Sequence, residues 1–516
     1  MSGLKWWETA VIYQIYPRSF QDSNGDGIGD LPGITSRLSY IADLGVDAIW
    51  ISPFFTSPQK DFGYDVADYC DINPEYGTLA DFDRLIETAH DLGLKLMIDI
   101  VPAHCSDQHR WFVESRQSRD NDRADWFHWV DPKPDGSAPT NWLSFFGGRA
   151  WSWEPRRQQY YLHNFLPSQP NLNHANPAVR EAMMDVARFW FDRGVDGFRL
   201  DAVHTINGDT APYRDNPVNP DFTLGPLPQD QQPFFRQLHD AAQLNQPGIQ
   251  AFSEAIRAVA DGYEDRFLMG EVDGDNDDAV KVSQTFTMPG RLHATYNFDL
   301  LEWAGLSVEE MKHAIARAAE AFNGTGRLSF AFSNHDVPRS ATRQLTALGL
   351  APDQRDAMQL LLLKLQSCLI GSSCVYQGEE LGLEDVRDIP IDRMMDPWGI
   401  EFAPAFLGRD TCRTPMVWRR DAPNGGFSDA NSTWLPVAED HLRRAGLDEV
   451  ERAGSIYNEF AGFLRWRRKQ PAMMDANRMS ELSGGPGQIV FDRVSDRQTI
   501  RCCFDFDTLT ASFEEV

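Results

Sequence analysis

"GFRLDAVH", residues 197–204, places an arginine and an aspartate two positions apart inside an otherwise apolar run. Side chains at this spacing share one face of a β-strand, so Arg199 and Asp201 should point the same way. In a barrel of parallel strands, the functional residues gather at the carboxyl ends of the strands. The stretch therefore predicts a buried strand that ends in a charged pair.

Seven other runs of β-branched or aromatic residues follow the same plan, and each ends in polar residues. They are "AVIYQIYP" (10–17), "VDAIWISP" (46–53), "LKLMIDIVPAH" (94–104), "RFLMGEVDG" (266–274), "ATYNFDL" (294–300), "RLSFAFSNHD" (327–336) and "SSCVYQGEE" (372–380). Between them lie amphipathic segments such as 79–93 and 177–194, which end in glycine. This alternation predicts an α/β fold, a (β/α)8 TIM barrel. A doubly wound sheet is the alternative, but no glycine-rich dinucleotide fingerprint follows the first strand.

Two segments stand outside the alternation of strands and helices. Residues 105–173, after the third strand, are rich in Trp, Pro, Gly, Asp and Arg, and they predict an inserted, loop-rich subdomain. Alternating runs near the end of the sequence predict a small β domain. We therefore expect a catalytic barrel over 1–104 and 174–454, with the C-terminal β domain over 455–516. The stretch 205–232, rich in Pro, Asn and Asp, predicts a long loop.

Composition narrows the possible partners. The chain of 516 residues carries a formal net charge of −28, which argues against nucleic acid and anionic membranes as partners. Its seven cysteines are odd in number and lack CxxC spacing, as expected of reduced thiols. The first residues lack the continuous apolar stretch of a signal peptide, and no run reaches the ~18 apolar residues of a membrane helix. We expect a cytoplasmic protein with a neutral small-molecule ligand, and the oligomeric state stays open.

Charged and imidazole side chains gather at the ends of four predicted strands. They are Asp99 and His104, then Arg199, Asp201 and His204, then Glu271, then Asn334, His335 and Asp336. One aspartate at a strand end is commonly a turn residue, but the same pattern on four strands points to a shared cavity. Paired carboxylates cleave glycosides, one as nucleophile and the other as general acid and then base. A neighbouring arginine is expected to keep the nucleophile ionised by lowering its pKa.

The chain resembles glycoside hydrolase family 13, the α-amylase superfamily, and within it the α-glucosidase and oligo-1,6-glucosidase branch. The resemblance covers nearly the whole chain. The motifs that carry it are "IYQIYPRSFQDSNGDGIGDL" (12–31), "GYDVADY" (63–69), "DIVPAH" (99–104), "QPNLN" (169–173), "GFRLDAVH" (197–204), "GEVD" (270–273), "FSNHD" (332–336), "YQGEELG" (376–382) and "CRTPMVW" (412–418). Each motif alone is weak evidence for membership of the family, but the whole set in this order is specific to the family.

The resemblance implies catalytic roles for three carboxylates. Asp201 matches the nucleophile, Glu271 the general acid/base, and Asp336 the third carboxylate, which orients sugar hydroxyls and stabilises the transition state. In this family the residue after the nucleophile also bears on linkage specificity: valine accompanies α-1,6 cleavage and a smaller residue α-1,4 cleavage. Ala202 at this position predicts α-1,4 bonds, as in maltose.

The resemblance also implies a closed pocket that holds the nonreducing sugar. The implied binding residues are Tyr64, Asp65, His104, Phe146, Arg199, His335 and Arg409. The pocket is expected to be closed by Asp65 of the "GYD" motif together with Arg409, and Arg413 is the second choice for the arginine. The Tyr64 ring is expected to stack against the sugar. Tyr64 and Arg413 could instead have only a structural role, packing against their neighbours.

The segment "DSNGDGIGD" (22–30) predicts a structural calcium or magnesium ion. Its oxygen donors lie at alternate positions, as in an EF-hand loop, and an Asp/Asn/Gly cluster is also a common turn. The expected ligands are Asp22, Asn24, Asp26, the Ile28 carbonyl and Asp30. Two positions depart from the wider family: Ala103 replaces an asparagine that binds another calcium, which puts that second site in doubt, and Asn171 replaces an aspartate. No organic cofactor is expected.

The sequence thus predicts a retaining, exo-acting α-glucosidase that forms a covalent β-glucosyl intermediate on Asp201, with glucosyl transfer to alcohol acceptors. A sucrose isomerase or trehalose synthase-like transglucosidase is the enzyme alternative. An endo-acting amylase would have an open cleft, which the closing residues argue against. A catalytically silent subunit like the transporter heavy chains is the non-enzyme alternative. Such a subunit would carry a membrane helix and need not keep the three carboxylates.

Overall fold

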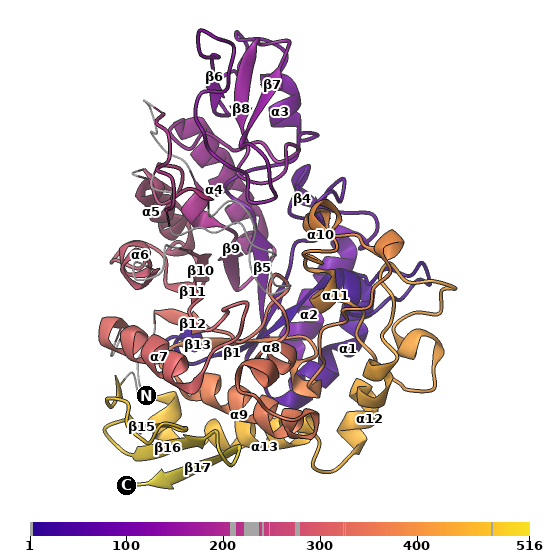
Figure 1. Ribbon diagram of the computed structural model, residues 1–516, viewed down its shortest axis with the longest axis vertical. Helices are drawn as coiled ribbons and strands as arrows, with labels where there is room; N and C mark the ends of the chain where they lie inside the picture. The colour runs from indigo at the N-terminus through magenta and orange to yellow at the C-terminus, as the bar shows by residue number, and fades with distance from the viewer. Residues whose placement is uncertain are drawn as a thin grey trace.

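Eight parallel strands close into a barrel in the computed structural model, which describes residues 4–206, 213–220, 237–239, 242–246, 248–273, 279–322, 325, 327–475 and 478–516. The strands are β1 (Val11–Ile15), β2 (Ala48–Ile51), β5 (Lys95–Ile100), β9 (Gly197–Leu200), β10 (Phe267–Glu271), β11 (Ala294–Asn297), β12 (Leu328–Phe330) and β13 (Ser372–Tyr376). They are neighbours in the order β1-β13-β12-β11-β10-β9-β5-β2 (Figure 1). All eight predicted strands are confirmed. Helices cover their outer faces, which is why these strands are mostly apolar.

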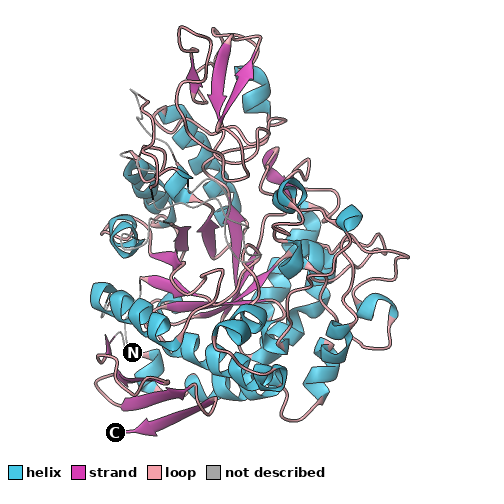
Figure 2. Cartoon of the chain, viewed as in Figure 1, coloured by secondary structure: helices cyan, strands magenta, loops and turns pink. Residues whose placement is uncertain are grey.

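Helices surround the barrel strands (Figure 2). They are α1 (Leu31–Leu44), α2 (Leu79–Asp91), α4 (Pro177–Asp192), α5 (Ile249–Ala260), α6 (Ala279–Phe286), α7 (Val308–Phe322), α8 (Ser340–Ala347) and α9 (Arg355–Cys368). The predicted helices at 79–93 and 177–194 are α2 and α4. Thr78 caps α2 by accepting from the Asp81 N–H, and Asn176 caps α4. Gly194, with φ +97°, ends the α4 segment in the left-handed conformation that favours glycine.

The segment between β5 and α4 forms a separate small layer at the top of Figure 1. It contains α3 (Arg110–Ser115) and a three-stranded sheet in the order β6 (Trp129–Val130), β8 (Gln159–Leu162), β7 (Trp151–Glu154). The hairpin β3 (Phe55–Thr56) and β4 (Asp68–Ile72) follows β2. An isolated bridge pairs His104 with Asn171, so the inserted segment leaves and rejoins the barrel at one point. This pairing returns the "QPNLN" motif to the carboxyl end of β5.

The C-terminal segment packs beneath the barrel in Figure 1. After α13 (Ile456–Arg467) and α14 (Pro471–Met474), the antiparallel strands β14 (Arg478–Met479), β15 (Gln488–Val494), β16 (Thr499–Asp505) and β17 (Thr510–Glu515) form one sheet. Burial alternates along β15, as expected of a strand with one face on a core. Phe463 of α13 and Phe513 of β17 lie with ring centroids 5.2 Å apart. The predicted C-terminal β domain is therefore present and continues the core of the barrel.

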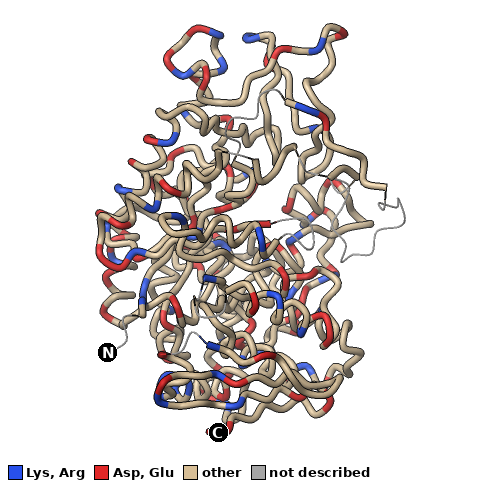
Figure 3. Tube along the Cα trace, turned by 90° about the vertical axis from the view of Figure 1, so that its left-hand side faces the viewer, with Lys and Arg blue, Asp and Glu red and all other residues tan. Residues whose placement is uncertain are grey.

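Short helices fill the remaining connections. They are α10 (Pro397–Phe402), α11 (Asp410–Arg413), α12 (Gly446–Glu451) and the 3-10 turns η1 (Trp6–Glu8), η2 (Pro17–Ser19), η3 (Val203–Thr205), η6 (Pro352–Gln354), η7 (Glu379–Leu381), η8 (Ile391–Arg393), η9 (Pro423–Gly426) and η10 (Asp440–Arg444). Most of the predicted loop 205–232 lies outside the described residues. In the part of the chain that the structure covers, no helix is both long and apolar enough to cross a membrane. Acidic and basic positions are interspersed over the molecule (Figure 3).

Candidate active site

Arg199 is the centre of the candidate site and binds three carboxylates. Its Nη1 lies 3.0 Å from both carboxylate oxygens of Asp99 and 2.6 Å from Oδ1 of Asp201. Its Nη2 lies 2.8 Å from Oε1 of Glu271. The side chain is fully buried, with the guanidinium 5.1 Å from the centre of the Trp50 ring. The strand register explains this cluster, because Asp99 of β5 lies directly opposite Arg199 of β9 and Glu271 ends β10 on its other side.

The electrostatics of Asp201 differ from the expectation that Arg199 lowers its pKa. Burial raises the pKa of Asp201, Arg199 opposes this, and the nearby charges of Glu271 and Asp99 raise it further. The net direction of the pKa is upward because burial outweighs the single cation, which three acids share. Burial likewise raises the pKa of Asp99 to about 7. The cluster therefore favours keeping a proton, and Asp201 can attack as an anion only when that proton lies on another acid of the cluster.

Asp336 is one carboxylate contacted by two arginines, whereas Arg199 is one arginine shared by three carboxylates. Its Oδ1 accepts from Arg409 Nη1 at 3.1 Å and from Arg413 Nη2 at 2.8 Å. Burial alone would raise the pKa of Asp336, but His335, Arg409 and Arg413 lower it below its usual range. Both arginines that the sequence offered as alternatives thus contact the same carboxylate. Arg413 is fully buried and also donates from Nε to the His335 carbonyl at 2.7 Å.

Arg409 is held against Asp61, not against Asp65. Its Nη2 donates to Oδ1 of Asp61 at 2.8 Å and to Oδ1 of Asp396 at 2.7 Å. The carboxylate of Asp65 is instead buried in its own loop, where it accepts from Ser57 Oγ at 2.9 Å and from the Asp61 N–H at 3.0 Å. The predicted closure by Asp65 is therefore corrected to Asp61. Both aspartates belong to the stretch "DFGYD", and Asp65 shapes the turn that presents Asp61.

Aromatic and imidazole groups form the rest of the wall. Tyr64 stacks on His335, with ring centroids 5.4 Å apart and planes 3° from parallel. The Tyr64 hydroxyl donates to Oδ2 of Asp99 at 3.2 Å and also contacts Nε2 of His335. Phe146 lies under the Arg409 guanidinium, 5.0 Å from ring centre to Cζ. Because Tyr64 is nearly fully buried against His335, its ring is fixed in place before any sugar arrives.

His104 and the inserted segment add further contacts to the site. The Nε2 of His104 donates to the Tyr64 carbonyl at 3.2 Å, and burial lowers the pKa of His104 to about 3, so the ring is neutral. Gln169, from the "QPNLN" motif, donates from Nε2 to Oδ2 of Asp61 at 2.9 Å. Sequence reasoning missed Gln169 and Asp61 as site residues, although Gln169 lies inside the "QPNLN" motif and Asp61 lies two residues before the "GYDVADY" motif.

Ala202 has a backbone role that the sequence did not reveal. It follows Asp201 in a left-handed conformation, with φ 40° and ψ 43°, and its N–H donates to Oε2 of Glu271 at 2.7 Å. Nδ1 of His204 approaches the Glu271 carbonyl at 3.4 Å, and the Asn334 side chain accepts from the Asp336 N–H at 2.8 Å. His204 and Asn334 thus hold the backbone of the site.

The loop predicted to bind a metal is folded by its own hydrogen bonds. Asp22 Oδ1 accepts from the Asn24 N–H at 2.9 Å, Asp26 accepts from the Ile28 N–H at 2.8 Å, and Asp30 caps α1 through the Gly33 N–H. Within the described ranges, no group of three or more His, Cys, Asp or Glu side chains is placed to hold a metal ion. The donors are all oxygens, as a hard cation requires, so binding here would depend on Asn24 and the Ile28 carbonyl as well as on the acids.

Comparisons with known proteins find relatives over most of the chain. A family model for the catalytic domain of α-amylase matches residues 14–476. A protein named "Probable alpha-glucosidase" from Rhizobium meliloti is 48% identical over 473 residues, which are 91% of this chain and 83% of that protein. An "Oligo-1,6-glucosidase" from Heyndrickxia coagulans is 35% identical over 544 residues, covering 99% of this chain and 94% of that protein.

Solved structures are similar over nearly the same length. The crystal structure of an α-glucosyl transfer enzyme matches with a TM-score of 0.90 and 44% sequence identity, covering 98% of this chain and 91% of that one. A trehalulose synthase from Pseudomonas mesoacidophila matches with a TM-score of 0.86 and 31% identity, covering 98% of this chain and 91% of the synthase. The similar proteins thus include both glucosidases and glucosyl-transferring enzymes.

Proposed function

Because this chain belongs to the α-amylase family of glycoside hydrolases, we propose that it is a retaining, exo-acting α-glucosidase. The observation that carries the proposal is the sharing of Arg199 by Asp201 and Glu271, at 2.6 Å and 2.8 Å. Two carboxylates on the terminal nitrogens of one guanidinium lie close together. Retaining glycosidases have their carboxylates about 5–5.5 Å apart, whereas inverting enzymes need about 6.5–9.5 Å to admit a water between them.

The geometry supports a two-step reaction. In the first step an oxygen of Asp201 bonds to the anomeric carbon of the terminal glucosyl unit as the glycosidic bond breaks, and Glu271 gives its proton to the departing oxygen. In the second step Glu271 takes a proton from water, and the water oxygen displaces Asp201. Two inversions at one carbon release α-glucose. Arg199 contacts both carboxylates in the resting site, so it can stabilise the negative charge on either carboxylate during the reaction.

The closed end of the pocket supports exo action. Arg409 joins Asp61, Asp336 and Asp396 into one buried cluster. These groups lie together with Tyr64 and His335, which fits recognition of the hydroxyls of a terminal sugar. The substrate class that follows is small α-glucosides. Ala202, a small residue after the proposed nucleophile, supports maltose-like α-1,4 substrates.

Replacement of the nucleophile tests the proposal. Asp201→Asn keeps the size of the side chain but removes the attacking oxygen anion, so turnover of maltose should fall at least about 10⁴-fold with the fold intact, since loss of a catalytic group costs this order. Asp421→Asn, at an exposed position, is the matched control and should keep full activity. Rates on maltose, isomaltose, sucrose and soluble starch complete the test. Substantial residual activity in Asp201→Asn, or equal cleavage of internal bonds of starch, would contradict the assignment.

A second candidate function is glucosyl transfer to an alcohol or sugar. It is favoured by the similarity of this chain to an α-glucosyl transfer enzyme, at 44% identity, and to a trehalulose synthase. The same β-glucosyl intermediate would pass to an alcohol oxygen instead of to water. Maltose supplied with an alcohol should then yield alkyl α-glucoside, and product analysis by chromatography separates this outcome from release of free glucose alone.

We propose in addition a structural Ca²⁺ or Mg²⁺ in the loop 22–30 and a cytoplasmic location. The all-oxygen donor set supports the ion, and chelation should then lower the melting temperature reversibly, while an unchanged melting temperature would contradict it. The seven free cysteines support a reducing compartment, which cell fractionation tests directly.

A further inference from the structure

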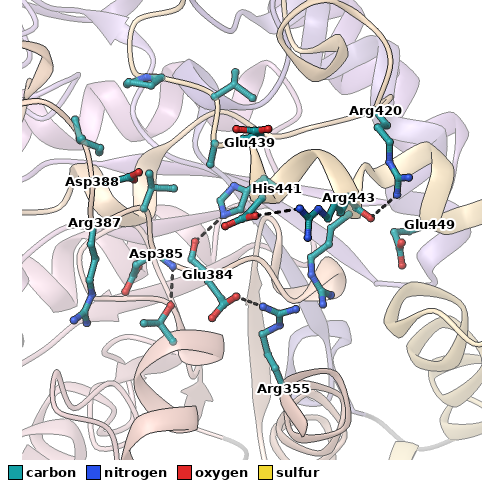
Figure 4. A pocket seen from close by; sticks show the side chains of 18 of the residues that line it. Arg355, Glu384, Asp385, Arg387, Asp388, Arg420, Glu439, His441, Arg443 and Glu449 are labelled. Carbon is teal, nitrogen blue, oxygen red and sulfur yellow. Dashed lines mark hydrogen bonds and ion pairs between the residues drawn. The ribbon is translucent and has the colours of Figure 1, made fainter. Parts of the chain in front are cut away.

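A cavity outside the catalytic site lies between the loop that follows β13 and the segment around η10 (Figure 4). Its volume is about 880 Å³, and its walls come from residues 384–390 and 436–452, together with α9 and its neighbours. Small-molecule sites in proteins have volumes of about 300–1,000 Å³. None of the carboxylates or aromatic groups assigned above to catalysis or sugar binding lines this cavity.

Charges in the lining compensate one another. The charged residues are Arg355, Arg387, Arg420, Arg443, Arg444 and Arg452 opposite Asp356, Glu384, Asp385, Asp388, Glu439, Asp440 and Glu449. Several are paired: Arg444 Nη2 lies 2.7 Å from Asp356, and Arg355 contacts Glu384. The lining therefore has no excess of positive charge to hold a phosphate. Across the residues that the structure describes, no cluster of acids is arranged to hold a metal ion either.

Two buried atoms of the lining accept hydrogen bonds but receive none from any described residue. They are Nδ1 of His441 and Oδ2 of Asp385. His441 is 4% exposed and donates from Nε2 to the Glu384 carbonyl at 2.9 Å, so Nδ1 of the neutral ring is an acceptor. Asp385 uses its other oxygen, Oδ1, to accept from the Arg339 N–H at 2.9 Å. A buried polar atom left unpaired costs about 1–3 kcal/mol, so a ligand that donates to both atoms would be favoured.

We propose that this cavity is a second binding site, for a neutral polyhydroxylated ligand of monosaccharide or disaccharide size. A hydroxyl group donates one hydrogen bond and accepts others. Hydroxyls of one sugar can therefore donate to Asp385 and His441 while they accept from the arginines. Val386, Pro436 and Val437 supply apolar surface for the C–H face of the ring. The choice of an α-glucoside as the sugar rests on the proposed function, whereas the need for hydroxyl donors does not.

Equilibrium dialysis of radiolabelled maltose against the full-length Asp201→Asn protein tests the proposal. This background should bind about two maltose molecules per chain, one in each site. Addition of Asp385→Asn replaces an acceptor in the lining with a donor-bearing amide and should reduce the stoichiometry to one. Val437→Trp fills the cavity without changing its polar groups and should do the same. Asp353→Asn is the control, because Asp353 is exposed and lies outside the cavity, and this variant should still bind two maltose molecules per chain. Melting temperatures show that each variant is folded.

Each result has a distinct meaning. Binding of one maltose that neither Asp385→Asn nor Val437→Trp affects would overturn the second site. Binding of one maltose that both variants abolish would support the second site while contradicting sugar binding at the catalytic carboxylates, and so the proposed function. Maltose bound in the lining only as weakly as an unrelated neutral solute, such as urea, would also overturn the proposal.

Discussion

Arg199 is a buried cation that three carboxylates share. A buried arginine is costly unless carboxylates surround it, and here Asp99, Asp201 and Glu271 all do so. The three acids in turn share one cation, which favours a retained proton. Asp336 has the reverse ratio, with two arginines on one carboxylate, and stays ionised. The site thus places a cluster that favours keeping a proton beside an acid whose pKa is lowered.

Ala202→Val should lower kcat on maltose and raise the ratio of isomaltose to maltose cleavage. The left-handed φ of 40° strains a β-branched residue by about 1–3 kcal/mol, which would draw the N–H away from Glu271. A loss of about 10-fold in kcat corresponds to about 1.4 kcal/mol. Ala202→Gly, which adopts positive φ freely, is the control and should keep most of kcat. Unchanged kcat and unchanged linkage ratio in the valine variant would show that neither the backbone strain nor the side chain matters.

His174 should make stability depend on pH. Burial lowers its pKa to about 4, and its Nε2 donates to the Pro102 carbonyl at 2.7 Å. The unfolded chain binds this proton below pH ~6.5, so the contribution of neutral His174 is complete above that pH and is lost as the pH falls toward 4. The free energy of unfolding of the wild type, relative to His174→Gln, should therefore fall by about 2 kcal/mol between pH 7 and 5. Urea unfolding measures this, and a difference independent of pH would contradict it.

The element that decides the pocket is α11 with the turn before it. Gly408 has φ +67°, and a Cβ there would meet Asp396 Oδ2 at 2.4 Å and the Gly399 nitrogen at 2.5 Å. This close approach brings the Arg409 N–H to Asp396 Oδ2 at 2.7 Å and fixes the direction of the guanidinium. The segment 396–409 therefore carries Arg409 to its position beside Asp61 and Asp336.

Gly408→Ala should disable the pocket with little effect on the barrel. The added methyl group must displace Asp396 or the backbone at Gly399, which moves Arg409. Misplacement of a binding group by about 1 Å can cost about 100-fold in rate, so kcat/KM on maltose should fall by that order. Gly93→Ala is the matched control, because Gly93 has φ +78° but nothing within 4 Å of the new Cβ. If both variants lose activity equally, backbone strain and not the position of Arg409 is the cause.

Elements that depend on local sequence pattern were predictable, whereas contacts made through loops were not. The eight strands are mostly apolar, so their runs stand out in the sequence. The choice between Asp61 and Asp65 depends on a turn in which Gln59 and Phe62 have positive φ, 60° and 46°, and no residue pattern reveals it. Gln169 reaches the site because Asn171 of the inserted segment forms an isolated bridge with His104, four residues after β5. The Ala202 N–H is a backbone group, which is invisible to reasoning from side chains.

At the scale of the whole molecule, the barrel brings distant segments together. Asp61 and Arg409 are 348 positions apart in sequence and meet at 2.8 Å. Arg199, Glu271 and Asp336 come from three further strand ends of the same barrel. The C-terminal sheet lies at the bottom of Figure 1, away from these strand ends, and adds to the core. The catalytic assembly is therefore a property of the closed barrel, and no single segment contains it.

The stereochemistry of the first product tests this account most directly. Hydrolysis of p-nitrophenyl α-glucoside, in which the glucosyl unit is the only source of glucose, can be followed by ¹H NMR from the first turnovers, before mutarotation, and shows which anomer is released. Two displacements through Asp201 predict that α-glucose appears first and that β-glucose grows in only at the rate of mutarotation. Initial release of β-glucose would mean a single inversion, and it would contradict the covalent intermediate on Asp201.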